Sequence, residues 1–206
     1  PEDLDEVIAG ARSLVSRLKE GRGDSIQIGI EVFAGDRELT RWQAPNLETA
    51  VLLERLSAIG EFTPEADDVT NLNGAIVQGL ERLAADTERF RLRNRGGAFT
   101  TEHLVVFTDG ADTAGFEDSG AVQARLAAHS AELTMIGLAS PELSTEALSL
   151  ISNDVLVSPS VGSLHRDFQA SAARIVRAME RTYLLAYCPP QQDGDHTVTV
   201  RLRGVE

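Results

Sequence analysis

The sequence has almost no cysteine. Cys188 is the only one in 206 residues, so the chain can form neither an intrachain disulfide nor a zinc site built from several thiolates. Basic residues are also scarce: 19 lysines and arginines stand against 32 aspartates and glutamates, a formal net charge of −13. Such an acidic chain is ill suited to a phosphate backbone, so we expect no nucleic-acid partner. No apolar run approaches the length of a membrane span, and no signal peptide is visible.

Motifs of common enzyme classes are absent as well. The chain contains no Gly-x-Ser-x-Gly nucleophile motif and no glycine-rich phosphate loop. Four histidines are scattered without metal-ligand spacing: His103, His129, His165 and His196. Cys188 precedes a proline at a predicted strand end, where a buried or edge residue is more typical than a nucleophile. We therefore expect a protein that is not an enzyme.

What is present is an alternation of helical and strand patterns in a chain of single-domain length. Helical spacing of apolar residues predicts helices over residues 4–19, 47–56 (with Asn46 as the cap), 71–85, 123–130, 144–152 and 163–181. Period-two alternation or short apolar runs predict strands over residues 25–33, 38–42, 103–108, 133–138 and 154–157. This alternation of strands and helices indicates βαβ crossovers. The expected fold class is α/β, with a doubly wound, mostly parallel sheet flanked by helices.

The end of the chain breaks this rhythm. Residues 183–188 and 196–202 are predicted as two strands with no helix between them. We therefore expect a main domain over residues 1–181 and a small C-terminal β extension over residues 182–206.

Two short motifs carry residues suited to metal chemistry. Thr70 stands at the mouth of the helix that begins near Asn71, and Asp109 follows the buried strand 103–108. In open α/β sheets, ligands collect at the carboxyl ends of the strands. A hydroxyl and a carboxylate that meet there suit a hard divalent cation such as Mg²⁺, which prefers oxygen ligands and keeps several waters.

With these motifs in this order, residues 1–181 resemble a von Willebrand factor type A domain, a Rossmann-like fold. In that family a metal-ion-dependent adhesion site combines Asp-x-Ser-x-Ser after the first strand, a threonine before a helix, and an aspartate after the fourth strand. Thr70 and Asp109 match the second and third elements. The resemblance implies Mg²⁺ or Mn²⁺ and a protein partner that offers an acidic side chain to the metal. The tail resembles an extension found in exported bacterial proteins, which implies an extracytoplasmic location.

One family element is missing from the sequence. No Asp-x-Ser-x-Ser occurs, and the helix beginning near Leu4 resembles the family helix that directly follows that loop. We therefore expect the first strand and its loop to lie before Pro1 or to come from another chain. The absent strand would lie between the strands of Ile26 and Leu104. Without it those strands would stand about 10 Å apart, which is two strand spacings.

Each site residue also has a simpler interpretation. Thr70 could cap the following helix, and Asp109 could shape a turn with Gly110. Asp112 and Thr113 could border a metal site, although solvated loop residues are more typical. The basic run 89–95 could be a solvated helix face or a docking patch for an acidic partner. If the simpler interpretations hold, the alternative function is a metal-free scaffold of the same fold.

Overall fold

The computed structural model describes residues 2–20, 25–64, 69–95, 99–140, 143, 145–182 and 199. Its helices are α1 (Glu2–Lys19), α2 (Thr49–Ser57), the short 3-10 helix η1 (Ile59–Glu61), α3 (Leu72–Arg93), α4 (Ser119–Ala128), α5 (Thr145–Ile151) and α6 (Val161–Glu180). Its strands are β1 (Ile28–Val32), β2 (Thr40–Asn46), β3 (His103–Thr108), β4 (Glu132–Leu138) and β5 (Asp154–Ser158). The expected α/β alternation is confirmed, and the predicted tail strands lie outside the described residues.

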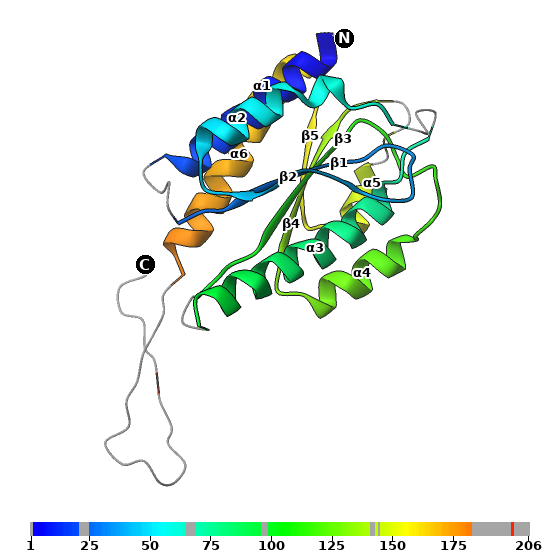
Figure 1. The fold of residues 1–206 in the computed structure, drawn as a ribbon. Coiled ribbons are helices and arrows are strands. Elements are labelled where there is room, and N and C mark those ends of the chain that lie inside the picture. The colour runs from blue at the N-terminus through cyan, green and yellow to red at the C-terminus, as the bar shows by residue number, and fades with distance from the viewer. Residues whose placement is uncertain are drawn as a thin grey trace, which may run out of the picture.

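The strands form a central layer with helices on both faces (Figure 1). Helices α1, α2 and α6 cover one face, and α3, α4 and α5 cover the other. Each face has its own hydrophobic core. On β3, Val105 and Phe107 pack toward the first core and Val106 toward the second. This alternation follows from the two-residue period of a strand, and it explains why strands covered on both faces are continuously apolar.

The strands belong to two separate sheets. β1 and β2 pair antiparallel, whereas β3, β4 and β5 form a parallel sheet in that order. Both sheets lie against the same two cores: Ile28 and Val105 pack on one, and Leu104 and Phe33, which directly follows β1, pack on the other. The sheets therefore lie side by side, yet the described residues contain no pairing of β1 with β3. The prediction of a further strand between them is compatible with this arrangement, and the described residues do not supply such a strand.

Several predicted boundaries were wrong. Asn46 is the last residue of β2 and not a helix cap, although its Oδ1 accepts a hydrogen bond from the Glu48 amide at 2.8 Å. α4 begins at Ser119, four positions before the prediction, because the Asp118 side chain caps it by accepting from the Ala121 amide. α3 continues to Arg93 instead of ending near residue 85. Its last turns are charged, so they lack the apolar period that marks a helix in sequence.

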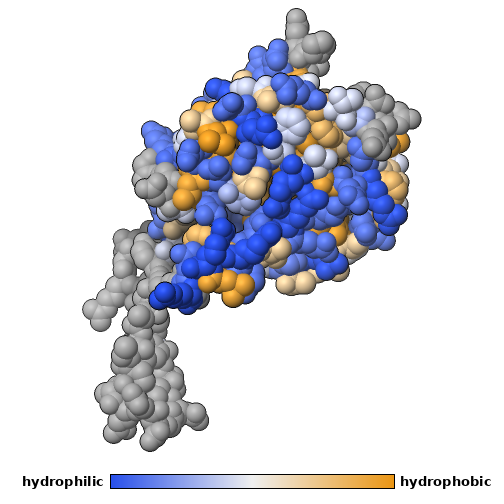
Figure 2. Space-filling model, in the orientation of Figure 1, coloured by the Kyte–Doolittle hydropathy of each residue, from blue (hydrophilic) through white to orange (hydrophobic). Residues whose placement is uncertain are grey.

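The face of the molecule that carries α3 is mainly polar. Figure 2 shows a largely hydrophilic face over α3, with apolar side chains scattered singly. Among the described helices, none combines the length and apolar character that a membrane span requires.

One titratable group in this framework should make stability depend on pH. His103, the first residue of β3, has a side chain only 15% exposed, and its Nδ1 lies 3.3 Å from a Glu132 carboxylate oxygen. Burial lowers the pKa of His103 below its usual 6.5, and the Glu132 charge offsets this only in part. The folded chain therefore disfavours the protonated form, whereas the unfolded chain takes up the proton as the pH falls below about 6.5.

We expect the free energy of unfolding to decrease on going from about pH 7.5 to about pH 5.5. His103→Gln should remove this contribution, which denaturant titrations of both proteins at the two pH values will measure. In Glu132→Gln the free energy of unfolding should decrease more between the two pH values. The substitution removes the negative charge that partly stabilises protonated His103 in the folded chain. An identical pH dependence in the unchanged protein and His103→Gln would refute the assignment.

Candidate functional site

The site lies at the carboxyl end of β3, where the loop after that strand meets the start of α3. α3 is capped by Asn71, whose Oδ1 accepts a hydrogen bond from the Gly74 amide at 3.1 Å. Thr70 precedes this cap, so the interpretation of Thr70 as the helix cap was wrong. The threonine hydroxyl is left available for another role.

Asn71 fixes the beginning of α3 against the turn between β1 and β2. It is 1% exposed, and its backbone amide donates to the Ala34 carbonyl at 2.7 Å. Its Nδ2 donates to the carbonyls of Asp36 at 2.8 Å and Arg37 at 3.2 Å. A buried amide that satisfies this many groups holds the neighbouring backbone of Thr70 in one place.

The loop after β3 is bonded directly to Thr70. The Thr70 amide donates to the Thr113 hydroxyl at 2.8 Å, and the Thr113 amide donates back to the Thr70 carbonyl at 2.9 Å. One carboxylate oxygen of Asp112 accepts from the Asn73 amide at 3.0 Å, and the other accepts from Gly115 at 3.2 Å. Asp112 and Thr113 therefore join two loops by hydrogen bonds, and Thr113 is also an exposed loop residue, as the sequence favoured.

Asp109 takes no part in shaping its own turn. Thr108 does this instead: its hydroxyl donates to the Gly110 carbonyl at 2.7 Å and accepts from the Gly110 amide at 3.3 Å. The Asp109 backbone carbonyl accepts from the Ser140 hydroxyl at 3.0 Å, which ties the turn to the loop after β4. The interpretation of the Asp109 side chain as a turn-forming group therefore has no support in the geometry.

The two motifs meet as their positions predict. A methyl group placed on Gly110 would lie 3.6 Å from the Thr70 hydroxyl oxygen, so that hydroxyl borders the turn beside Asp109. Neither the Thr70 hydroxyl nor the exposed Asp109 carboxylate bonds to another residue in the part of the chain that the structure describes. A free hydroxyl and a free carboxylate at one sheet edge fit a hard divalent cation chemically.

The described residues offer few candidate metal ligands at this edge of the sheet. Across the described ranges, no group of three or more histidine, cysteine, aspartate or glutamate side chains is placed to bind a metal. Two oxygen ligands leave most positions of an octahedral ion to water or to groups from elsewhere.

Two arginines of the basic run at the end of α3 make contacts within the molecule. Arg89 pairs with Asp86, and the Nε and Nη2 of Arg91 donate to the Thr100 hydroxyl at 3.0 and 2.7 Å. These contacts favour a structural role for the run over a docking patch.

A sequence model of the von Willebrand factor type A domain matches residues 1–164. No curated protein matches the chain. A solved structure of mussel byssus proximal thread matrix protein 1, with a zinc-occupied MIDAS motif, is similar at TM-score 0.62 and 16% identity, covering 84% of this chain and 43% of that one. A von Willebrand factor type A structure from Catenulispora acidiphila gives TM-score 0.58 and 13% identity, covering 82% and 37%.

The vWF domain of the type V pili tip protein Mfa5 from Porphyromonas gingivalis is similar at TM-score 0.51 and 13% identity, covering 88% of this chain and 91% of that one. The chain thus spans less than half the length of the mussel and Catenulispora chains. At these identities, the likeness to the three structures shows the fold alone.

Proposed function

Because the chain belongs to the von Willebrand factor type A family, we propose that it is a protein-binding module whose partner docks at a divalent metal bound by Thr70 and Asp109. The observation that carries the proposal is a hydroxyl and a carboxylate at the carboxyl end of β3, neither of which bonds to another of the described residues. The surrounding hydrogen bonds fix the backbone of both loops, and among the described residues none of these bonds uses the Thr70 hydroxyl or the Asp109 carboxylate. A binding site needs that combination of a rigid frame and available ligands.

The metal would be Mg²⁺ or Mn²⁺, since both accept oxygen ligands. Thr70 would contribute a neutral hydroxyl and Asp109 a negative carboxylate. An acidic side chain of the partner protein would take an open position on the metal. Metal and partner would then each raise the affinity of the other, because the coupling between two bound ligands is reciprocal.

The alternative function is a metal-free scaffold of the same fold, which would use its surface to bind neighbouring domains. The small number of protein ligands among the described residues favours this alternative. The two functions differ in whether a divalent ion changes partner binding.

We further propose that the module has no catalytic activity of its own and acts outside the bacterial cytoplasm. The sequence offers no recognisable nucleophile motif, which supports the first point. The similarity to a domain of a pilus tip protein supports the second.

The metal site can be tested on residues 1–206. We expect weak Mn²⁺ binding, since one carboxylate and one hydroxyl supply little charge. Asp109→Ala should weaken it further by about tenfold, because the only charged ligand is lost. Titration calorimetry and the electron paramagnetic resonance of free Mn²⁺ will measure the affinity.

Glu88→Ala is the matched control because it removes an equal charge from an exposed position on α3. Thr70→Ser keeps a hydroxyl and should retain binding, whereas Thr70→Ala should weaken it. Equal Mn²⁺ affinity in Asp109→Ala and Glu88→Ala would make the metal-free scaffold the better proposal.

A further inference from the structure

β5 is the last strand of the parallel sheet, and within the described residues it pairs with β4 alone. The Ser158 carbonyl accepts from the Ala139 amide after β4 at 2.8 Å, so the backbone of Ser158 points toward β4. Successive residues of a strand direct their N–H and C=O groups to opposite sides. The N–H and C=O groups of Val155 and Val157 therefore point away from β4, toward the free edge.

This edge lacks the protection that β2 has. β2 is likewise paired on one side among the described residues, but it carries Arg41 and Pro45 and its register with β1 shifts at two places. Charge, proline and bulges of this kind hinder pairing with a further strand. β5 pairs with β4 in unbroken register, and its three middle residues are valine and leucine. β5 is therefore able to accept one more strand.

Helix α6 contacts both ends of β5. Its Asp167 accepts from the Ser158 hydroxyl at 2.5 Å, and its Arg174 pairs with Asp154 at the other end of the strand. Asp154 also accepts from the Thr134 hydroxyl at 2.8 Å, so both carboxylates are engaged. The side of α6 that carries Asp167 and Arg174 therefore lies along β5.

Exposed arginines extend this side of α6. They recur at spacings of eight, three and four residues, which keeps side chains on one face of a helix: Arg166, Arg174, Arg177 and Arg181. Within the described residues, the side chains of Arg166, Arg177 and Arg181 form no hydrogen bond or ion pair. The opposite side of α6 packs on α1, where Phe168 contacts Gly10. The arginine row therefore borders the free edge of β5.

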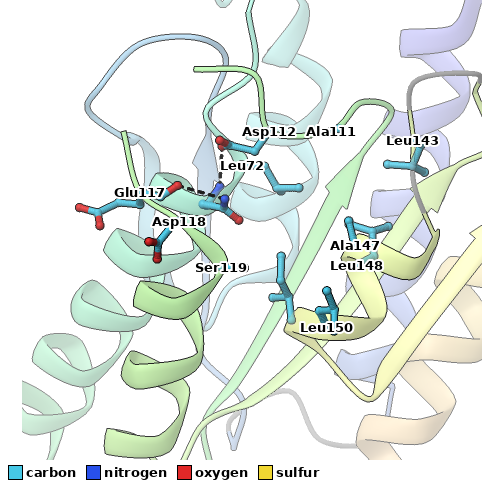
Figure 3. Close-up of a pocket in the computed structure, with 12 residues that line it drawn as sticks. Leu72, Ala111, Asp112, Glu117, Asp118, Ser119, Leu143, Ala147, Leu148 and Leu150 are labelled. Atoms are coloured by element: carbon cyan, nitrogen blue, oxygen red, sulfur yellow. Dashed lines mark hydrogen bonds between the residues drawn. The ribbon is translucent and has the colours of Figure 1, made fainter. Parts of the chain in front are cut away.

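A positive surface is unusual on this molecule, whose formal net charge is −13. Figure 3 shows the contrast on the other face of the sheet, where Asp112, Glu117 and Asp118 lie around the cavity between α3, α4 and α5. An acidic ligand is repelled by such carboxylates and attracted to unpaired guanidinium groups. The arginine row is therefore the place where an acidic ligand is favoured.

We propose that the free edge of β5 binds an extended, acidic segment of a partner protein as an additional strand. The backbone of the segment would pair with Val155 and Val157. Since alternate side chains of a strand share one face, acidic residues at every second position would lie on the α6 side, near the arginine row. The surface includes neither Thr70 nor Asp109, so this binding does not depend on the proposed metal.

Other occupants fit this edge less well. In a dimer formed by two β5 edges, the two arginine rows would lie on the same face and repel each other. A nucleic acid has no peptide backbone to pair with the strand. α4 and α5 make their crossovers on one face, whereas α6 lies on the other (Figure 1). A right-handed crossover through α6 therefore leads back toward β4 and β3, and not to the free edge of β5.

The probe is the acetylated and amidated peptide Thr-Glu-Val-Glu-Val-Glu-Thr, and the control peptide has glutamine in place of each glutamate. As the acidic peptide is added to residues 1–206, two-dimensional NMR should show the amide resonances of Val155 and Val157 moving. The exchange of both amides should slow, because they gain acceptors. The glutamine peptide should bind about tenfold more weakly, since it loses several exposed ion pairs.

Two kinds of variant separate charge from backbone pairing. Arg177→Gln combined with Arg181→Gln should weaken binding of the acidic peptide about fivefold. Arg93→Gln is the matched control, because it removes the same charge from an exposed position on α3, and it should leave the affinity unchanged. Val157→Pro removes an N–H that points away from β4, so it should keep the pairing of β4 with β5 and abolish peptide binding.

Modified peptides test the backbone pairing on the unchanged protein. Of two peptides N-methylated on the valines or on the glutamates, one should lose binding and the other keep it, because only one set of N–H groups faces β5. The proposal is overturned if both bind like the parent peptide, or if the glutamine peptide binds as tightly as the acidic one. It is equally overturned if the Val155 and Val157 amides neither shift nor gain protection. Self-association of residues 1–206 in sedimentation equilibrium, abolished by Val157→Pro, would assign the edge to a second copy and overturn it too.

Discussion

Asn71→Asp should be among the most destabilising single substitutions in this chain, with an expected loss of about 3 to 5 kcal/mol of unfolding free energy. The new side chain keeps an oxygen that can accept from the Gly74 amide, so the helix cap itself is retained. It can no longer donate to the carbonyls of Asp36 and Arg37, which Nδ2 contacts at 2.8 and 3.2 Å. A carboxylate 1% exposed beside two carbonyl oxygens is both buried and repelled.

Asn94→Asp is the matched control, because it makes the same chemical change at the other end of the same helix. Asn94 is exposed, and within the described residues its Nδ2 donates to the Phe90 carbonyl alone, at 2.8 Å. Its substitution should cost less than about 1 kcal/mol. Guanidinium unfolding followed by circular dichroism will measure both proteins. Equal midpoints would show that the Asn71 amide contributes little beyond capping.

Asn71→Asp should also lower the Mn²⁺ affinity of the candidate metal site. Thr70 is adjacent in sequence, and Thr113 bonds to the Thr70 backbone. A displaced helix start would move both loops, so Mn²⁺ binding should fall along with stability. Metal binding at this edge would then depend on a residue that offers no ligand.

The features that the sequence could predict are those governed by local periodicity. The run from His103 to Thr108 and the run from Leu133 to Leu138 indicated strands covered on both faces, because continuous apolar segments of that length have few other uses. The approach of the loop after β3 to the start of α3 could also be predicted, since the loops of an open α/β sheet gather at the carboxyl ends of its strands.

The features that the sequence could not predict are set by contacts between distant segments. Asn71 and Thr70 are both plausible helix caps by residue type, and only the position of the β1–β2 turn makes Asn71 the buried one. Asp112 looks like an ordinary loop residue until its carboxylate meets the Asn73 amide, 39 positions earlier in the chain. The hydrogen bond from the Asn73 Nδ2 to the Glu117 carbonyl likewise joins segments far apart in the sequence.

The separation of the two sheets leads to the prediction with the largest expected effect. β3 pairs only with β4, and β1 only with β2, within the described part of the chain. The unpaired edge of β3 is apolar, with Leu104, Val105 and Phe107 half-buried. Edge strands of stable proteins are normally protected by charge, proline or a bulge, and this edge has none of them along its length.

We expect that a strand supplied from outside residues 1–206 completes the sheet between β1 and β3. It should be continuously apolar, because the cores on both faces would cover it. Joining such a strand, followed by Asp-x-Ser-x-Ser, ahead of α1 should raise the unfolding free energy by several kcal/mol. Each new ladder hydrogen bond contributes about 0.5 to 1.5 kcal/mol, and apolar burial adds to that sum.

Hydrogen exchange will locate the added strand. In residues 1–206 the amides of β1 and β3 that face the gap should exchange rapidly, and in the extended chain they should become protected. An otherwise identical extension with proline at the centre of the strand is the control, because proline cannot donate to the ladder. Unchanged exchange of the β3 amides in the extended chain would show that the two sheets are complete as they stand.

The same extended chain separates sheet completion from metal binding. Its Asp-x-Ser-x-Ser loop adds a carboxylate and two hydroxyls, so Mn²⁺ affinity should rise well above that of residues 1–206. Asp109→Ala in the extended chain should reverse most of this rise while leaving the β3 amides protected, since within the described part of the chain Asp109 bonds through its backbone and not through its side chain. If protection and affinity were instead lost together, Asp109 would act on the sheet and not on the metal.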